Sequence, residues 1–179
     1  LTDADNNVAV GYFALSSDTQ GSKSTAVGRE ALRQQNFSSA TDSHNTAVGY
    51  SAGTAVTTGV RNTLTGSLSG DAITDGTDNT AFGYEALTTN TTAGTNTAIG
   101  AYAMQDNLTG ANNTSVGYLA LGNNTTATGN TATGYKALED NTEGHSLAAF
   151  GAYALGNNTT GDYNVAVGYS CMSGMTEGN

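Results

Sequence analysis

A glycine recurs through the whole chain, and its 17-residue period is the strongest regularity of the sequence. The stretches NVAVGYFAL, NTAVGYSAG, NTAFGYEAL, NTSVGYLAL and NTATGYKAL align on it, and the anchors are Gly11, Gly28, Gly49, Gly66, Gly83, Gly100, Gly117, Gly134, Gly151 and Gly168. Subtraction of neighbouring anchor numbers gives eight steps of 17 and one of 21, so ten copies fill positions 1–179 as one continuous array. The four extra residues lie within 33–44 and should bulge from one turn without interrupting the array, because loops absorb insertions easily.

Three columns of equivalent residues precede the anchor glycine and alternate as side chains of a β-strand do. The Val column, directly before the glycine, is mostly β-branched or aromatic, as expected of a buried strand position. The Ala column before it is nearly all small, which indicates close packing. The Thr column, one residue earlier, exchanges Thr for Val or Ala, which predicts an inward methyl group. In chain order, the Val column is Val10, Val27, Val48, Thr65, Phe82, Ile99, Val116, Thr133, Phe150 and Val167; the Ala column is Ala9, Ala26, Ala47, Leu64, Ala81, Ala98, Ser115, Ala132, Ala149 and Ala166; the Thr column is Val8, Thr25, Thr46, Thr63, Thr80, Thr97, Thr114, Thr131, Ala148 and Val165.

The residues after the anchor glycine also repeat. A Tyr usually follows it directly, but at Tyr102 and Tyr153 the Tyr comes one residue later. A small residue and then Leu or Met come next, as at Ala86 and Leu87, and Leu and Met exchange at nearly constant volume. A segment resembling NNTTG closes most copies. Its Gly and Asn residues suit tight corners because they tolerate positive φ.

A 17-residue unit is too short for a strand, a helix and two connections. It suits one coil of a solenoid, with short strands joined by tight turns. We therefore predict an all-β fold, a parallel β-solenoid or β-roll of ten coils, in which identical residues lie above one another as ladders. At a strand spacing of ~4.8 Å, ten coils form a rod roughly 50 Å long. Both ends lie at equivalent points of a repeat without a recognisable polar cap, so we expect a fragment of a longer array.

Composition agrees with a thin, ordered structure. Only 37% of residues are hydrophobic and Trp is absent, which argues against a thick core, while 11% charge and no Pro argue against disorder. The net charge of −10 disfavours nucleic acid and anionic membranes as partners. No run approaches the length that spans a bilayer, so no membrane insertion is expected of this segment.

The stretch NTAVG followed by small residues resembles the SVAIG-type head repeats of trimeric autotransporter adhesins. Lines such as NTAFGYEALTTNTTAG look like the arrays of phage tail fibres. The resemblance covers essentially the whole chain, although adhesin-head coils are generally shorter. It implies a left-handed β-roll in which three chains pack side by side, with the Ala column facing the other chains. The alternative is a single-chain solenoid whose Ala column faces its own interior.

No residues form a recognisable catalytic or cofactor-binding constellation, so we do not expect an enzyme. His44 and His145 lie far apart in the array, and Cys171 stands where other copies have Ala or Ser. Acidic residues gather in the turns without the regular spacing of calcium-binding repeats, so no metal or cofactor is predicted. These acidic residues include Asp71, Asp75, Asp78, Asp106, Glu139, Asp140 and Glu143.

Asn-x-Ser/Thr triplets recur at one corner of the repeat, which we expect to be exposed. The candidate N-glycosylation sites with the most regular placement are Asn90, Asn107, Asn124 and Asn158; the pattern also occurs at Asn36, Asn112, Asn113, Asn123 and Asn157. Chance is a rival explanation, because a chain rich in Asn and Thr produces such triplets often.

Two functional hypotheses follow. The first is a structural shaft or adhesive segment of an extracellular fibre at a cell surface or on a virion, which self-associates as a homotrimer or filament and meets a host-surface glycan or receptor. The second is a surface-binding module that recognises ice or polysaccharide through ladders of Thr and Asn. The exchange of Thr for Val argues against the second, because buried positions exchange in this way.

Overall fold

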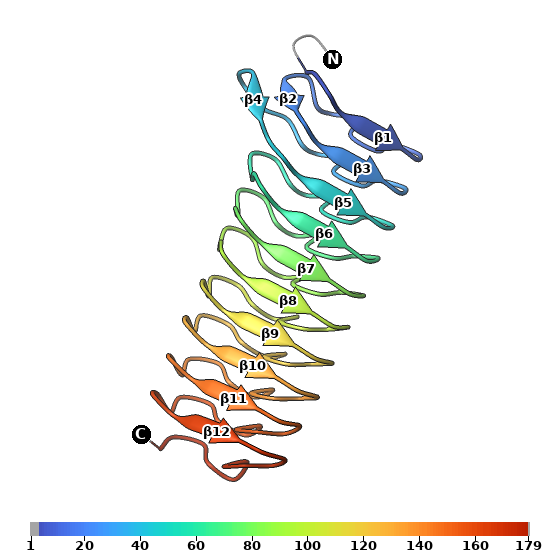
Figure 1. Cartoon of the computed structure of the whole chain (residues 1–179). Helices are drawn as coiled ribbons and strands as arrows, with labels where there is room; N and C mark the ends of the chain where they lie inside the picture. Colours follow the sequence, from blue (N-terminus) through green and yellow to red (C-terminus); the bar gives the residue numbers. More distant parts are fainter. Residues whose placement is uncertain (1–3, 179) are drawn as a thin grey trace.

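The chain forms one β-solenoid in which each sequence repeat makes one coil, and the coils stack along a single axis (Figure 1). The computed structural model describes residues 4–178. Ten short strands, one per coil, form a continuous sheet, and two more pair beside its N-terminal end. The strands are β1 (Val8–Val10), β2 (Gly21–Ser22), β3 (Thr25–Val27), β4 (Thr41–Asp42), β5 (Thr46–Val48), β6 (Thr63–Thr65), β7 (Thr80–Phe82), β8 (Thr97–Ile99), β9 (Thr114–Val116), β10 (Thr131–Thr133), β11 (Ala148–Phe150) and β12 (Val165–Val167).

The sheet is parallel throughout and keeps one register, so the predicted ladders are present. Each member of a column pairs with the next member of the same column, as Ala81 does with Ala98. The insertion leaves this register intact, because Ala26 pairs with Ala47 across it. Its residues include β4, which pairs with β2, and Gln35, which is buried against neighbouring polar groups. The solenoid and its tolerated insertion are thus confirmed.

The anchor glycines from Gly11 to Gly151 lie where a Cβ would collide with the backbone of the next coil. Gly117 has a φ of +141°, and a Cβ added to it would lie 2.4 Å from the carbonyl oxygen of Gly134 in the next coil. Adjacent coils therefore approach closely at each strand end, and the absence of a side chain makes the stacking distance possible. This contact explains why the glycine recurs in every copy.

The interior is lined by the Ala column from one side and by the Ala–Leu pairs from the other. Ala26, Ala81 and Ala132 are fully buried, as are Leu87 and Leu121. Because the Ala column faces the chain's own interior, the prediction that it contacts other chains is wrong. The single-chain alternative describes the position of these alanines correctly.

The Val column and the Thr column point away from the interior. Phe82 is 57% exposed and Ile99 39% exposed, while Thr80 and Thr97 are partly exposed. The predictions that the Val column is buried and that the Thr column turns a methyl group inward are therefore wrong. The coil interior is too narrow for large side chains on both walls, and Leu already fills it from the opposite side.

In one part of the core, the large side chain stands in the Ala column instead of at the usual Leu position. Gly53 and Gly70 stand where other coils have Leu, and Leu64 stands in the Ala column between them. A Cβ on either glycine would lie within 2.7 Å of a Leu64 methyl carbon. Leu64 thus fills the space that the glycines leave, together with Val56 and Ile73, and the core stays packed.

A buried ladder of asparagines ties the coils together. In the coil that contains β8, the Asn96 amide nitrogen donates to the Gly110 carbonyl at 2.8 Å, and its oxygen accepts the Asn113 backbone N–H at 3.0 Å. The same pair of bonds recurs at Asn62, Asn79 and other members of the column. Burial of these amides is tolerated because both ends of each are hydrogen-bonded.

Candidate interaction surfaces

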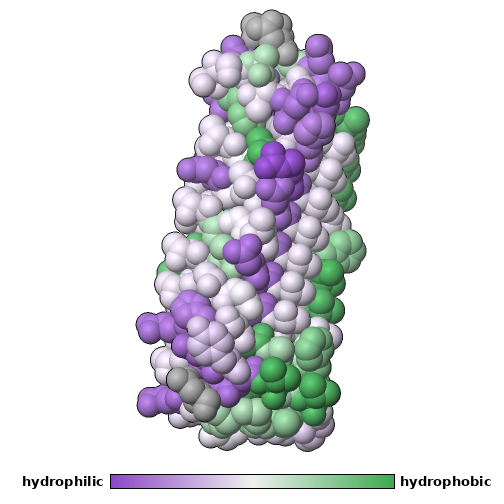
Figure 2. Space-filling view, turned by 60° about the vertical axis from the view of Figure 1, so that its left-hand side comes forward, coloured by the Kyte–Doolittle hydropathy of each residue, from purple (hydrophilic) through white to green (hydrophobic). Residues whose placement is uncertain are grey.

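The outward side of the ten-stranded sheet is the first candidate surface. We call it the sheet face; it consists of the Val column and the Thr column. Figure 2 shows apolar side chains along one edge of the rod, beside a file of near-neutral ones, while hydrophilic side chains gather on the neighbouring corner. Neither column contains a charged residue. The sheet face is therefore an uncharged strip that runs the length of the described rod.

A ladder of aromatic rings lies at the corner that follows the sheet face. The rings of Tyr84, Tyr102, Tyr118, Tyr135, Tyr153 and Tyr169 touch in that order, with centroids 5.3–6.0 Å apart. Tyr102 and Tyr153 join it although each comes one residue late in its coil, and each residue has a φ near +60°. This φ is not special to the two tyrosines, because the equivalent position has a positive φ in the other coils as well, for example at Glu85 and Lys136. The late Tyr is visible in the sequence, but the continuity of the ring ladder is visible only in the structure.

A cation takes the place of a ring near the N-terminal end of the ladder. Arg29 occupies the Tyr position of its coil, and its guanidinium lies 5.8 Å from the Tyr12 ring centre and 5.6 Å from that of Tyr50. Such cation–π contacts are favourable at partly exposed sites. The Tyr84 phenol hydrogen-bonds to the Glu85 carboxylate, which raises the pKa of Tyr84 above its ordinary value.

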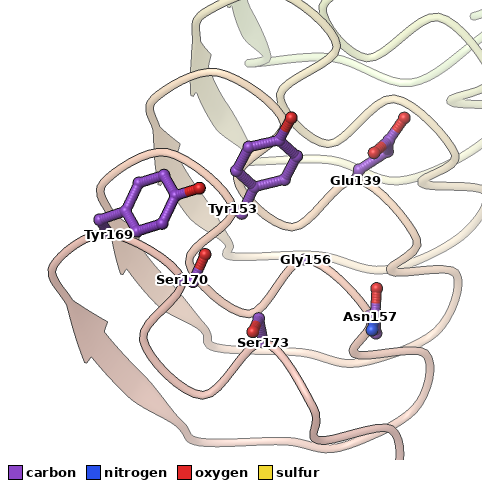
Figure 3. Close-up of a pocket in the computed structure, with 7 residues that line it drawn as sticks. All are labelled: Glu139, Tyr153, Gly156, Asn157, Tyr169, Ser170 and Ser173. Carbon is purple, nitrogen blue, oxygen red and sulfur yellow. The ribbon is translucent and has the colours of Figure 1, made fainter.

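A shallow hollow of about 290 Å³ opens beside the ladder near β12 (Figure 3). It is lined by Glu139, Tyr153, Gly156, Asn157, Tyr169, Ser170 and Ser173. Its cause is Gly156, which stands between Glu139 and Ser173 in one column; a Cβ there would meet only backbone atoms. The equivalent space at Gly122 is filled by the Leu119 side chain. The hollow combines aromatic faces, hydroxyls, an amide and a carboxylate.

The four regular glycosylation candidates do not lie at an exposed corner. Asn90, Asn107, Asn124 and Asn158 are fully buried and form a second ladder, in which Asn124 Nδ2 donates to Asn107 Oδ1 at 2.7 Å. The expectation of exposure was wrong because side-chain amides can satisfy one another across coils. In the folded chain these nitrogens face the interior, so a glycan could be attached to them only before folding. Among the other triplets, the structure exposes Asn36, Asn112, Asn123 and Asn157.

The remaining candidates stay apart in space. Within residues 4–178, no three His, Cys, Asp or Glu side chains lie close enough together to hold a metal ion. His145 Nδ1 accepts the Thr128 backbone N–H at 2.9 Å, so this ring links equivalent turns of two neighbouring coils. Cys171 is partly buried beside the core.

The basic side chains are engaged locally. All five lie within ion-pair distance of a carboxylate: Lys23 with Asp42, Arg29 and Arg33 with Glu30, Arg61 with Asp78, and Lys136 with Glu139. The Arg61 guanidinium holds the pKa of Asp78 below its ordinary value. Burial raises the pKa of Asp71, which also accepts a hydrogen bond from Thr88. The surplus negative charge is therefore carried by the turns and corners.

Residues 4–178 contain no helix long and apolar enough to cross a membrane. Comparison with protein-family models, with curated proteins and with solved structures gives no match for the chain.

Proposed function

We propose that this chain is a structural shaft or adhesive segment of an extracellular fibre. The observation that carries the proposal is the equivalence of the coils: one three-residue strand recurs in one register at ten successive levels. A shaft requires each coil to bind its two neighbours in the same way, and such arrays gain stability one coil at a time. Successive coils carry similar side chains at equivalent positions, which suits a mechanical role better than catalysis.

In this proposal the chain associates with further copies, as a homotrimer or a filament, and stands at a cell surface or on a virion as adhesins and tail fibres do. A host-surface glycan or receptor is its ligand, bound weakly at many levels. The tyrosine ladder supports this assignment, because the faces of sugar rings present C–H groups that lie well against aromatic rings. The net charge of −10 argues against nucleic acid as a partner.

Mass per unit length, measured by scanning transmission electron microscopy, tests the proposal. One chain of 18.0 kDa extended over roughly 48 Å contributes about 0.4 kDa per Å of rod. We expect rods with an integral multiple of this value, two or three for laterally associated chains. Particles with the mass and length of a single chain at every concentration would contradict the fibre.

A second function is favoured by one observation. The Thr column has seven consecutive threonines, Thr25 to Thr131, and their side chains lie on the outside of the rod, where the sequence had suggested burial. Hydroxyl and methyl groups at a constant rise could recognise ice or a crystalline polysaccharide. Thermal hysteresis, or retention on insoluble cellulose or chitin, is the expected result. Its absence from correctly folded protein would rule this function out.

A further inference from the structure

We propose that the sheet face is the surface through which this chain binds a second copy of itself, face against face. The inference rests on the proposed fibre function and specifies where the copies meet. It moves the contact from the Ala column, which is buried inside each chain, to the Val and Thr columns.

The sheet face combines two neighbouring columns that both lack charge. All twenty positions, two on each of ten strands, are uncharged, although the chain has 20 charged residues and a net charge of −10. Several other columns that point outward carry charge, for example at Glu85, Lys136, Asp78 and Asp140. One further uncharged column, from Thr57 to Thr159, is a single file beside a column that contains Asp75 and Glu143. Two acidic chains repel each other, so they can associate closely only through a strip that lacks carboxylates.

The sheet face also exposes large apolar side chains at successive levels of the rod. Within the interior coils, Val48 is 37% exposed, Phe82 57% and Phe150 42%. Three-residue strands at ten levels span roughly 45 Å by 10 Å, or about 450 Å² of flat area. A contiguous apolar patch of a few hundred Å² on a soluble protein commonly marks a binding site.

The size of the strip fits a partner that runs alongside it. Specific interfaces bury about 800 Å² on each partner, so the two columns supply roughly half of that area. The tyrosine ladder at the adjoining corner widens the strip and can supply much of the remainder. Because each coil adds an equal increment, a longer array would bind more tightly.

A second copy fits the strip better than a crystalline lattice does. Its own Val and Thr columns repeat at the same rise, so favourable contacts recur at each level. The Val column mixes Phe82, Ile99 and Val116 with Thr65 and Thr133, and these side chains differ in height. A protein face can repack around such relief, whereas a rigid lattice needs identical groups at every level.

The backbone leaves only side chains for the contact. The strands donate and accept their hydrogen bonds along the axis, to the coils on either side, as Thr97 N–H does to the Asn113 carbonyl at 2.8 Å. Two sheets that meet face to face then pack through β-branched and aromatic side chains, at a separation of about 10 Å.

The test places three carboxylates on the sheet face and compares them with three placed elsewhere. The variant V48E/I99E/F150E changes one residue in each of three coils, and two unaltered coils separate successive sites, so the new charges do not stack on one another. The matched control T58E/T109E/T160E alters the same three coils at an exposed corner and adds the same charge. Sedimentation velocity of the full chain reports association, and circular dichroism reports folding.

We expect the wild type and T58E/T109E/T160E to associate, and V48E/I99E/F150E to sediment as an 18.0-kDa monomer with an unchanged spectrum. Its apparent Kd should rise at least about 100-fold, because like charges facing each other cost several kcal/mol. If V48E/I99E/F150E does not fold, V48T/I99T/F150T replaces it, since Thr already occupies this column at Thr65 and Thr133. The Kd of that variant should rise about tenfold.

Each remaining outcome would refute the sheet face as the interface, the fibre proposal or both. Association of both the wild type and V48E/I99E/F150E would refute the sheet face as the interface and leave the fibre proposal standing. Loss of association in T58E/T109E/T160E as well would show that net charge, not the face, controls assembly. A monomeric wild type at all concentrations would refute both proposals.

Discussion

Replacement of Asn124 by Ala should destabilise the protein by about 2–4 kcal/mol, whereas the same change at its neighbour Asn123 should have almost no effect. Asn124 is fully buried. Its Nδ2 donates to Asn107 Oδ1 at 2.7 Å and to the Ala127 carbonyl at 3.2 Å, and its oxygen accepts from Asn141 Nδ2 at 3.3 Å. The Asn123 side chain is exposed, and its Nδ2 donates to Asp140 Oδ1 at 3.0 Å in an exposed hydrogen bond.

The magnitude follows from which groups lose their last partner. The Ala127 carbonyl keeps a bond from Asn113 Nδ2 at 2.8 Å. Asn141 Nδ2 likewise keeps its bond to the Gly144 carbonyl at 3.0 Å. Within residues 4–178, Asn107 Oδ1 has no other side-chain donor, and an unsatisfied buried acceptor costs about 1–3 kcal/mol. The small cavity left by the missing amide adds about 1 kcal/mol.

Urea unfolding followed by circular dichroism measures the difference between the two variants. Because long repeat arrays can unfold coil by coil, hydrogen exchange should accompany it and show protection lost mainly around residues 107–141. Equal unfolding midpoints for N124A and N123A, with equal exchange, would refute the reasoning. The buried amide ladder would then contribute nothing to the stacking of the coils.

Three further perturbations test the contacts of an anchor glycine, the packing of the core and the titration of a partly buried carboxyl group. Gly117→Ala should lower the free energy of unfolding by about 3 kcal/mol or more, because the φ of Gly117 is +141° and the new Cβ would lie 2.4 Å from a carbonyl oxygen. Gly174→Ala should be neutral in the same denaturation assay, since no heavy atom lies within 4 Å of the Cβ position there. Leu64→Ala should lower the free energy of unfolding by about 2–5 kcal/mol. The added change Gly53→Leu should recover part of this loss, because it restores the Ala and Leu arrangement of the other coils. A double variant that is less stable than L64A would contradict this expectation. Asp71→Asn should stabilise the protein at pH 7, because burial raises the pKa of Asp71 in the folded chain and so disfavours its charged form there. The gain in stability should vanish as the pH falls below the pKa of Asp71 in the unfolded chain. A gain that does not depend on pH would refute burial of the charge as its cause.

The repeat length predicted most of the architecture. A 17-residue period leaves room for little except a solenoid coil, and the glycine anchors located the strand ends. The insertion after Arg33 was predicted to leave the stack intact, as Ala26 pairing with Ala47 confirms. These features follow from spacing alone, which a single sequence displays in full.

The side-chain ladders were harder to predict because amino-acid type does not reveal the partner. Asn124 followed by two threonines matches a glycosylation triplet, yet its partner is the equivalent amide one coil away. The neighbouring pair Asn157 and Asn158 contains the same triplet twice, with one member exposed and the other buried. The regular recurrence of Asn at one position was the available signal, since a buried ladder requires it and an exposed corner does not.

The period of two also left one question open, namely which side of the strand faces inward. It predicted correctly that the Val and Thr columns share one side and the Ala column takes the other. The usual assumption that β-branched and aromatic residues lie inside then gave the wrong direction, because the narrow interior accepts Ala on this wall. Val, Ile and Phe nevertheless have a strong tendency to be covered. If a second copy binds the sheet face, Ile99 and Phe82 are buried in the assembly although they are exposed in the single chain. The composition of the Val column is then explained by an interface between chains, and the same residues decide the result of the V48E/I99E/F150E experiment.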